Sequence, residues 1–326
     1  MRRREFIAGL GSAAAWPVAA SAQQPPLPVI GFLNTRGPLL EETNFLFFRK
    51  GLQDMGYVEG SNVAFEHRGT QQNYQLAALA AELARRQVAL IVAIGAANSA
   101  LAAKAATATI PIVFLNGSDP VKLGLVASLN RPGGNMTGVS NYQGLLGAKR
   151  FELLRQLVPQ ATNIALLRNP TNLISVGDTE DLQNAARSVN QQLIVFNATN
   201  EEEIDAAFAA AAERRVGALI VNVDGSLFSW RKEQIIALAA HYGIPASYSS
   251  RNFPARGGLM SYGSLQSDVY RQVGLYAGRI LKGEKPADLP VQQSTNTELV
   301  INLKTAKSLG LTFPITLLGR AHEVIE

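Results

Sequence analysis

The sequence alternates short runs of aliphatic and β-branched residues with Ala-rich stretches of helical periodicity, and it completes this series twice. The ten apolar runs begin at Val29, Val63, Leu90, Ile110 and Met136 in the first half, and at Ile164, Leu193, Leu219, Ile244 and Leu259 in the second. Continuous apolar runs bounded by turns are typical of parallel strands that are buried on both faces. The pattern therefore predicts an α/β fold in which helices cover both sides of parallel sheets.

The two halves share their spacing as well as their order. Val63 precedes Leu90 by 27 residues, and Leu193 precedes Leu219 by 26. Each interval holds a strand, a polar turn, an Ala-rich helix that ends in Arg-Arg, and the next strand. This duplication predicts two similar α/β lobes, and a length of 326 residues fits two domains of about 100–200 residues each. One continuous, doubly wound sheet remains the alternative.

The C-terminal part does not fit a third lobe. It reads as a helix over 268–282, a strand over 298–302 and a short helix over 304–309. We expect this tail to cross between the lobes, so that several crossings form a hinge beside a cleft. The predicted boundaries are 28–140 plus about 264–290 for the first lobe, and 141–263 plus about 291–326 for the second.

The first 22 residues have the pattern of an export signal. Three arginines (Arg2, Arg3 and Arg4) precede a short apolar stretch, which ends in Ala20-Ser21-Ala22. The arginine run resembles a twin-arginine signal, while an ordinary Sec signal and a cytosolic amphipathic N-terminus remain alternatives. We expect cleavage after Ala22 and a mature periplasmic protein. The chain has no cysteine, which excludes disulfides, a lipid anchor on cysteine and thiolate metal sites.

Polar residues follow the predicted strands, where ligands of parallel α/β sheets bind. Asp119 and Asp224 are the candidates for a cationic group, and the turns with Asn98 and Ser99 and with Thr171 and Asn172 are the candidates for a carboxylate. The aromatic candidates for stacking on an apolar part are Tyr142, Tyr248 and Tyr262, and the remaining candidate binding residues are Arg36, Ser118 and Asn169. The alternative role for each of the short polar residues is to cap a helix without contacting a ligand.

Several classes of function lack their motifs. The chain has no G-x-x-x-x-G-K-[ST] phosphate loop, no G-x-G-x-x-G after the first strand and no G-x-S-x-G turn. With three histidines and no cysteine, a metal site is not expected, and we predict no cofactor and no catalytic residues. The net charge of +5 comes without a basic cluster beyond the N-terminus, so no nucleic-acid partner is expected.

Specific motifs resemble one family. They are GSDPVKLGLV (117–126), NRPGGNMTGVS (130–140), GAKRFELL (147–154), NPTN (169–172), ILKGEKPADLPVQ (280–292) and NLKTAK (302–307). Together they resemble the ABC-transporter substrate-binding proteins of the tryptophan- and tyrosine-binding type, over nearly all of the mature chain. The resemblance implies a type I periplasmic-binding fold, with two flavodoxin-like lobes that close on a small solute.

The resemblance also implies a function and its partners. We expect a non-enzymatic periplasmic receptor for a small polar solute, either an amino acid or a related small organic molecule, with aromatic solutes among the candidates. We expect it to act as a monomer with an ABC permease in the inner membrane. An exported sensor for a membrane receptor and an exported enzyme on the same scaffold remain alternatives. Three departures from the family pattern leave the identity of the ligand undetermined. They are Arg168 before Asn169, Gly225 after Asp224, and the sequence QSTNTE at 293–298.

Overall fold

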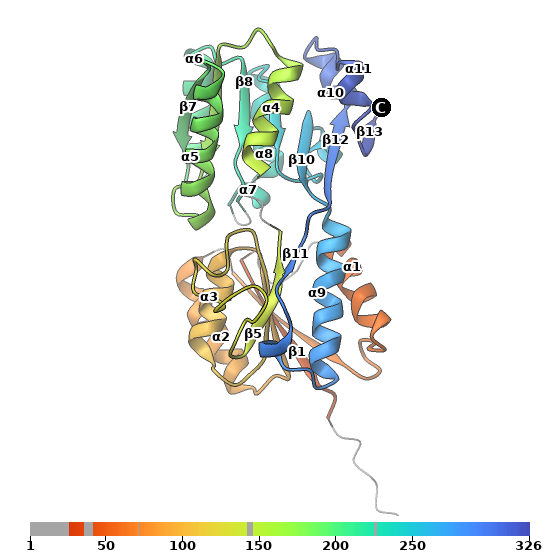
Figure 1. Cartoon of the computed structure of the whole chain (residues 1–326). Helices are drawn as coiled ribbons and strands as arrows, with labels where there is room; N and C mark the ends of the chain where they lie inside the picture. Colours follow the sequence, from red (N-terminus) through yellow and green to blue (C-terminus); the bar gives the residue numbers. More distant parts are fainter. Residues whose placement is uncertain (1–25, 36–41, 71, 142–145, 225–226) are drawn as a thin grey trace, which may run out of the picture.

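Two α/β lobes lie end to end in the computed structural model, with their sheets separate (Figure 1). The structure describes residues 26–35, 42–70, 72–141, 146–224 and 227–326. Because each lobe has its own sheet, the two-lobed prediction is confirmed, and the alternative of one continuous sheet is wrong. None of the helices within the described part of the chain combines the length and the apolar character needed to cross a membrane.

The first lobe is a sheet of six parallel strands in the order β11-β5-β4-β3-β1-β2. Its strands are β1 (Val29–Asn34), β2 (Ala64–Gly69), β3 (Leu90–Ile94), β4 (Ile112–Asn116), β5 (Met136–Ser140) and β11 (Gln292–Gln293). Its helices are α1 (Glu42–Asp54), α2 (Leu76–Arg85), α3 (Ala97–Ala106) and α9 (Gln266–Leu281), with short 3-10 turns at Asn73–Gln75 and Pro286–Asp288. Helices α1 and α9 cover one face of the sheet, and α2 and α3 cover the other.

The second lobe is a sheet of seven strands in the order β13-β12-β10-β9-β8-β6-β7, in which only β10 and β12 pair antiparallel. Its strands are β6 (Asn163–Arg168), β7 (Gln192–Asn197), β8 (Ala218–Val221), β9 (Ala246–Tyr248), β10 (Met260–Ser264), β12 (Thr297–Asn302) and β13 (Glu323–Ile325). One face carries α4 (Gly147–Leu157), α5 (Leu173–Ser188), α10 (Leu303–Ser308) and α11 (Ile315–Leu318). The other face carries α6 (Glu201–Glu213), α7 (Leu227–Trp230) and α8 (Lys232–His241), with a 3-10 turn at Pro254–Arg256.

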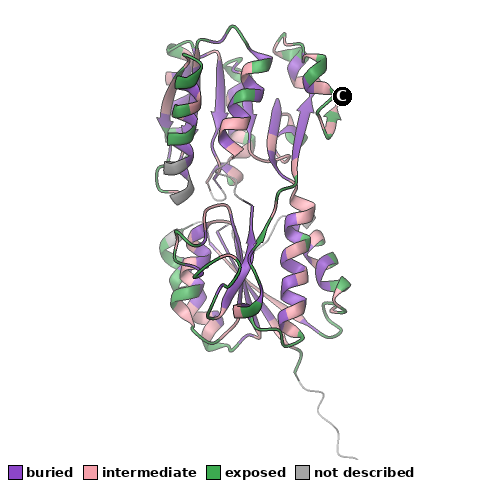
Figure 2. Ribbon diagram, in the orientation of Figure 1, coloured by how far each residue is buried: buried purple, intermediate pink, exposed green. Residues whose placement is uncertain are grey.

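The central strands explain why the apolar runs are continuous. Successive side chains of a strand point to opposite faces. Along β3, Leu90, Val92 and Ile94 pack toward α1 and α9, whereas Ile91 and Ala93 pack toward α2 and α3. Every position of this strand therefore faces a helical layer, and Figure 2 shows the strands buried beneath the exposed outer faces of the helices.

Within the described part of the chain, three segments lie where the two lobes join: Asn141 after β5, the junction of β10 with α9, and residues 294–296 between β11 and β12. Backbone and side-chain hydrogen bonds join these segments to one another. The hydroxyl of Ser264 donates to the carbonyl of Asn141 at 3.0 Å, and the amide of Leu265 donates to the carbonyl of Asn296 at 2.9 Å. The amide of Ser294 donates to the carbonyl of Ser140, also at 2.9 Å. The three crossings therefore form a single hinge beside the space between the lobes.

Candidate functional site

A pocket lies between the lobes and takes its walls from both. It encloses about 820 Å³ of empty space, part of which opens to solvent. The first lobe contributes Asn44, Gly95, Ala96, Leu115, Gly117, Asn141, Gln266 and Tyr270. The second lobe contributes Asn172, Val223, Asp224, Ser229, Lys232, Ser249, Ser250, Asn252 and Phe253. The cavity volume of the enclosed part is about 90 Å³.

The pocket forms where the carboxyl ends of the parallel strands of the two sheets meet. Gly95 and Ala96 follow β3, Gly117 follows β4, and Val223 and Asp224 follow β8. Gly95 adopts a positive φ of 102°, and a β-carbon there would lie 2.5 Å from the hydroxyl oxygen of Thr35. Glycine is therefore required at this position for the backbone to line the pocket closely.

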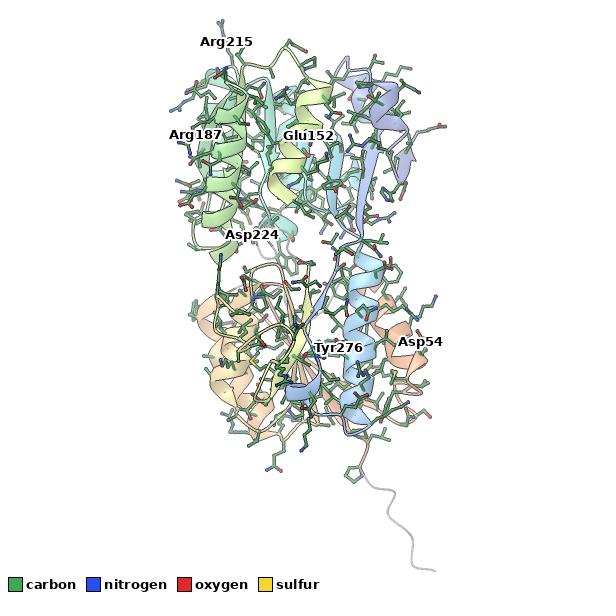
Figure 3. All side chains as sticks on the ribbon, viewed as in Figure 1. Asp54, Glu152, Arg187, Arg215, Asp224 and Tyr276 are labelled. Atoms are coloured by element: carbon green, nitrogen blue, oxygen red, sulfur yellow. The ribbon has the colours of Figure 1, made fainter. Side chains whose placement is uncertain are left out.

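The carboxylate of Asp224 is held in place by the neighbouring strand-end loop. The side-chain amide of Asn169 donates to it at 2.7 Å, and the carbonyl oxygen of the same amide accepts from the backbone N–H of Thr171 at 3.0 Å. The main-chain carbonyl of Asp224 accepts from the hydroxyl of Ser229 at 2.8 Å. Asp224 is 5% exposed and lies on the side of the second lobe that faces the first (Figure 3).

The pocket also contains a cation. Lys232, the first residue of α8, donates from Nζ to the carbonyl of Ser229 at 2.9 Å. Among the described residues that line the pocket, Lys232 and Asp224 are the two charged ones, and they have opposite signs. Both come from the second lobe, while the first lobe contributes the side-chain amides of Asn44, Asn141 and Gln266.

Two aromatic side chains give the pocket apolar surface. Phe253, from the loop after β9, and Tyr270, from the second turn of α9, are 4% and 3% exposed respectively. Phe253 is fixed by stacking on Tyr248, with ring centroids 4.4 Å apart and ring planes at 11°. Tyr270 belongs to the core between α9 and the first sheet.

The structure brings only some of the predicted binding residues to this pocket. Asn172 and Asp224 line it, and Asn169 contacts Asp224. Arg36 and Tyr142 lie outside the described residues. The predicted residues that do not line the pocket are Asn98, Ser99, Ser118, Asp119, Tyr248 and Tyr262.

Local hydrogen bonds and burial account for several of these positions. The hydroxyl of Ser99 donates to the backbone carbonyls of Ile94 and Ala96. The carboxylate of Asp119 accepts from the backbone N–H groups of Val121 and Lys122, so it stabilises its own turn. The hydroxyl of Tyr262 lies 3.0 Å from Oγ1 of Thr297, within the second lobe. Tyr248 is buried in the core of that lobe behind Phe253.

Sequence reasoning missed Lys232, Phe253, Gln266 and Tyr270 among the pocket residues. Lys232 and Phe253 follow their strands at a distance, so the rule of looking directly after a strand does not find them. Gln266 and Tyr270 lie on α9, whose N-terminus directly follows a hinge crossing. The predicted hinge could have indicated Gln266 and Tyr270, because a helix that begins where the chain crosses between the lobes begins beside the cleft.

An ion pair is fully buried in the second lobe. A guanidinium nitrogen of Arg150 on α4 lies 3.5 Å from the carboxylate of Asp178 on α5, and both side chains are inaccessible to solvent. Burial raises the pKa of Asp178 to about 6, an effect that the positive charge of Arg150 opposes, and burial lowers the pKa of Arg150. A β-carbon on Gly147 would lie 2.1 Å from the Asp178 carboxylate, so the two helices pack closely here. This pair does not line the pocket.

No cluster of three or more His, Asp or Glu side chains suited to a metal ion occurs among the described residues. The described residues that line the pocket offer hydrogen-bonding groups, two opposite charges and two aromatic rings. This arrangement can bind a solute that carries both charges and an apolar part.

Comparisons with known proteins agree with this description. A family model described as "ABC transporter substrate binding protein" matches residues 42–325. A curated tyrosine-binding protein of Clostridioides difficile (strain R20291) is 29% identical over 266 residues, which covers 81% of this chain and 75% of that protein.

Solved structures overlap with nearly the whole chain. A conserved domain protein from Vibrio cholerae has a TM-score of 0.82 at 27% identity, and covers 91% of this chain and 99% of its own. An ABC domain from Streptococcus pneumoniae in complex with L-Trp has a TM-score of 0.81 at 26% identity, with 92% and 100% covered.

A third solved structure has the same level of identity. A ligand-free, open substrate-binding protein with adhesive properties from Clostridium difficile is also 26% identical and covers 92% of this chain and 99% of its own, but its TM-score is 0.64. At equal identity and equal coverage of this chain, the overlap is therefore better with the L-Trp complex than with the open structure.

Proposed function

The chain belongs to the family of ABC transporter substrate-binding proteins, and from this premise we propose that its solute is an aromatic α-amino acid. As a member of that family it is a solute-binding receptor of an ABC importer. The proposal concerns the class of solute and the residues that recognise it. The observation that carries it is the pairing of Asp224 and Lys232 with Phe253 and Tyr270 in one pocket.

The opposite charges of the pocket match those of a zwitterion. A free amino acid carries an ammonium and a carboxylate, which need an acceptor and a donor when they leave water. Asp224 supplies the acceptor, Lys232 supplies a cationic donor, and we assign Asn172 to the same polar end of the solute. Since Asn169 already donates to Asp224, this carboxylate is oriented before the solute arrives.

The aromatic rings support an aromatic side chain on the solute. Phe253 and Tyr270 come from different lobes, so a ring between them would contact both lobes. Aromatic pairs favour offset stacking or edge-to-face contact, which adds about 0.5–1.5 kcal/mol beyond the burial of their area. The names of the relatives support the same class, since one is a tyrosine-binding protein and one structure holds L-Trp.

A pocket shared by two lobes couples binding to closure. A solute that contacts both lobes only in the closed arrangement shifts the population toward that arrangement. In this proposal the segments joined by hydrogen bonds between the lobes act as the hinge of that motion. We propose that the closed form, recognised at its outer rims, is what an inner-membrane permease receives.

The remaining parts of the proposal concern chemistry and location. Members of the family and the relatives found are binding proteins, and we propose that this chain likewise releases its solute unchanged. ABC substrate-binding proteins act outside the cytoplasm, and we propose export to the periplasm with cleavage after Ala22.

Thermal unfolding with matched solutes tests the proposal. L-Tryptophan, L-tyrosine and L-phenylalanine are compared with tryptamine, which lacks the carboxylate, with indole-3-propionate, which lacks the ammonium, and with L-leucine and D-galactose. A solute at 100 times its dissociation constant adds about 2.7 kcal/mol to the stability of the native state, which raises the Tm by several degrees.

We expect at least one aromatic amino acid to raise the Tm, with at least tenfold weaker binding of its analogues that lack one charge. Mass spectrometry should recover that amino acid unchanged after incubation. Equal binding of tryptamine, indole-3-propionate and L-tryptophan would contradict the roles of the two charges. A shift from D-galactose alone would contradict the solute class.

A further inference from the structure

The chain directly after β9 forms one wall of the interlobe pocket, and we call residues 249–253 the pocket loop. Four of its residues line the pocket: Ser249, Ser250, Asn252 and Phe253. The fifth, Arg251, does not line it. Its guanidinium contacts two carboxylates elsewhere in the second lobe, one on β12 and one on β13. The pocket loop therefore presents its other side chains to the pocket and is anchored to the sheet through Arg251.

Arg251 pairs with the two carboxylates through different nitrogens. Nη1 donates to Oε2 of Glu298 at 3.0 Å, and Nη2 donates to the carboxylate of Glu323. A guanidinium presents its donors in a fixed planar fork, so two partners determine its orientation as well as its position. A lysine at this position would have a single ammonium for both carboxylates. The contacts of Arg251 therefore suit a side chain that holds the backbone of its loop in one place.

Glu298 is the buried member of this group. It is 3% exposed, whereas Arg251 and Glu323 are partly exposed. Burial raises the pKa of Glu298, and the positive charge of Arg251 opposes this rise. The second oxygen of Glu298, Oε1, is buried and has no hydrogen bond to the described residues. Removing Arg251 would therefore take a cationic hydrogen-bond partner from a nearly buried carboxylate, which is unfavourable.

Glu298 also lies where the hinge meets the second sheet. It is the second residue of β12, directly after the hinge segment 294–296, and it pairs with Gly263 of β10 in the antiparallel ladder. The residue after Gly263 is Ser264, whose hydroxyl donates to the carbonyl of Asn141 in the hinge at 3.0 Å. The pair of Arg251 and Glu298 therefore connects the pocket loop to the strand that enters the second lobe from the hinge.

We propose that Arg251 is a positioning residue for solute binding. By pairing with Glu298 it holds the pocket loop at the hinge end of β12, so that Phe253 and its neighbours are in place when the lobes close on a solute. Arg251 does not itself contact the solute. This inference rests on the proposed function, because it requires a solute bound between the lobes, and it adds a determinant of affinity that lies outside the pocket wall.

Amide hydrogen exchange of the full chain without solute tests whether the pair holds the pocket loop. The amide of Phe253 donates to the carbonyl of Ser250 at 3.2 Å, within the loop. Arg251→Met and Glu298→Gln should each speed the exchange of this amide at least tenfold, because the loop opens more often when its anchor is lost. Arg279→Met removes a comparable ion pair on the first lobe and should leave this exchange unchanged.

Calorimetric titration with L-tryptophan tests the consequence for binding. Arg251→Met and Glu298→Gln should each weaken binding at least fivefold, and the double variant should bind no more weakly than the weaker single variant, because both changes break the same pair. Arg251→Lys should lose less affinity than Arg251→Met, since an ammonium can still pair with one carboxylate. If Arg251→Met does not fold, Arg251→Lys and Glu298→Gln provide the same comparison. Arg279→Met should bind as the unmodified chain does.

Unchanged exchange at Phe253 in the variants would overturn the anchoring of the pocket loop. Faster exchange throughout the second lobe, or a loosened loop with unchanged affinity, would leave Arg251 a structural role only and would overturn the proposal. Additive losses in the double variant would overturn the pairing with Glu298. Failure of every aromatic amino acid to bind the unmodified chain would contradict the proposed solute instead, while the exchange measurement, which needs no solute, still decides whether Arg251 holds the loop.

Discussion

The side-chain amide of Asn169 donates a 2.7 Å hydrogen bond to the carboxylate of Asp224, which joins the loop after β6 to the loop after β8. The two strands are neighbours in the sheet, so the bond ties adjacent strand ends at the floor of the interlobe pocket. It leaves the carboxylate oriented and nearly buried at a place where a cationic group of a solute can reach it. The charge of Asp224, rather than this hydrogen bond, is therefore what we expect solute affinity to depend on most.

Removing that charge should weaken binding without unfolding the protein. Asp224→Ala and Asp224→Asn should each lower the affinity for the amino-acid solute at least tenfold, because the ammonium loses its anionic partner. Calorimetric titration measures the affinity, and circular dichroism checks the fold. Asp288→Ala, at an exposed position outside the pocket, is the matched control. Unchanged affinity in the Asp224→Ala chain would contradict the assignment.

Lys232 should recognise the other end of the solute. Lys232→Met should reduce the affinity for L-tryptophan at least tenfold and should change the affinity for tryptamine little, because tryptamine has no carboxylate to lose a partner. Parallel titrations with the two compounds give this difference directly. Lys304→Met, on the exposed side of α10, serves as the control. An equal loss for both compounds would point to a structural role of Lys232 instead.

The packing of α1 against α9 should not tolerate a side chain at Gly274. A β-carbon there would lie 2.2 Å from the carbonyl oxygen of Phe48 and 2.9 Å from the backbone nitrogen of Leu52. Gly274→Ala should therefore lower the free energy of unfolding by about 1–3 kcal/mol, the usual cost of overpacking. Thermal unfolding measures the loss, with Lys282→Ala at the exposed end of α9 as the control. A Tm equal to that of the control would show that the helices separate easily.

The buried pair of Arg150 and Asp178 should make stability depend on pH. Burial raises the pKa of Asp178 from an ordinary value of 3.8 to about 6, so between these values the native state binds a proton that the unfolded state does not. As the pH rises from about 4 to 6, the titration of Asp178 should therefore lower the free energy of unfolding. The double variant Arg150→Met/Asp178→Leu should lack this part of the slope.

Urea unfolding at several pH values measures the difference between the two chains. Burial also raises the pKa of Glu298, but this group is present in both chains and cancels in the difference. Asp178→Leu alone should be destabilised by about 3–5 kcal/mol, because it leaves a buried guanidinium without its carboxylate. Identical pH slopes in the unmodified and double-variant chains would contradict the raised pKa.

Export should depend on the arginines at the N-terminus. If the signal follows the twin-arginine route, Arg3→Lys/Arg4→Lys, at the pair directly before Glu5, should strongly reduce the amount of protein in the periplasm. A Sec signal would tolerate this exchange of arginine for lysine. Mass spectrometry of the exported chain should find Gln23 at its N-terminus. A mature N-terminus at another residue would contradict the predicted cleavage site.

The sequence by itself determined the two-lobed α/β architecture and part of the site. Buried parallel strands need apolar residues at every position, so the repeated runs predicted β1 to β10. The short edge strands β11 and β13 were not predicted. Asn172 and Asp224 could be predicted because they follow β6 and β8 closely, and the ends of parallel strands meet at one edge of a sheet. Such predictions hold because residues that are close in sequence remain close in the folded chain.

Tertiary structure alone decided which other side chains reach the pocket. The pleat of β9 directs Ala246 and Tyr248 into the core toward α8, and a shift by one residue would have reversed this. Phe253 lines the interlobe pocket, and Tyr248 lies behind it in the core of the second lobe. Tyr270 reaches the site because the chain returns from β10 of the second lobe to the first lobe as α9. Such contacts depend on packing between distant segments, which no local pattern records.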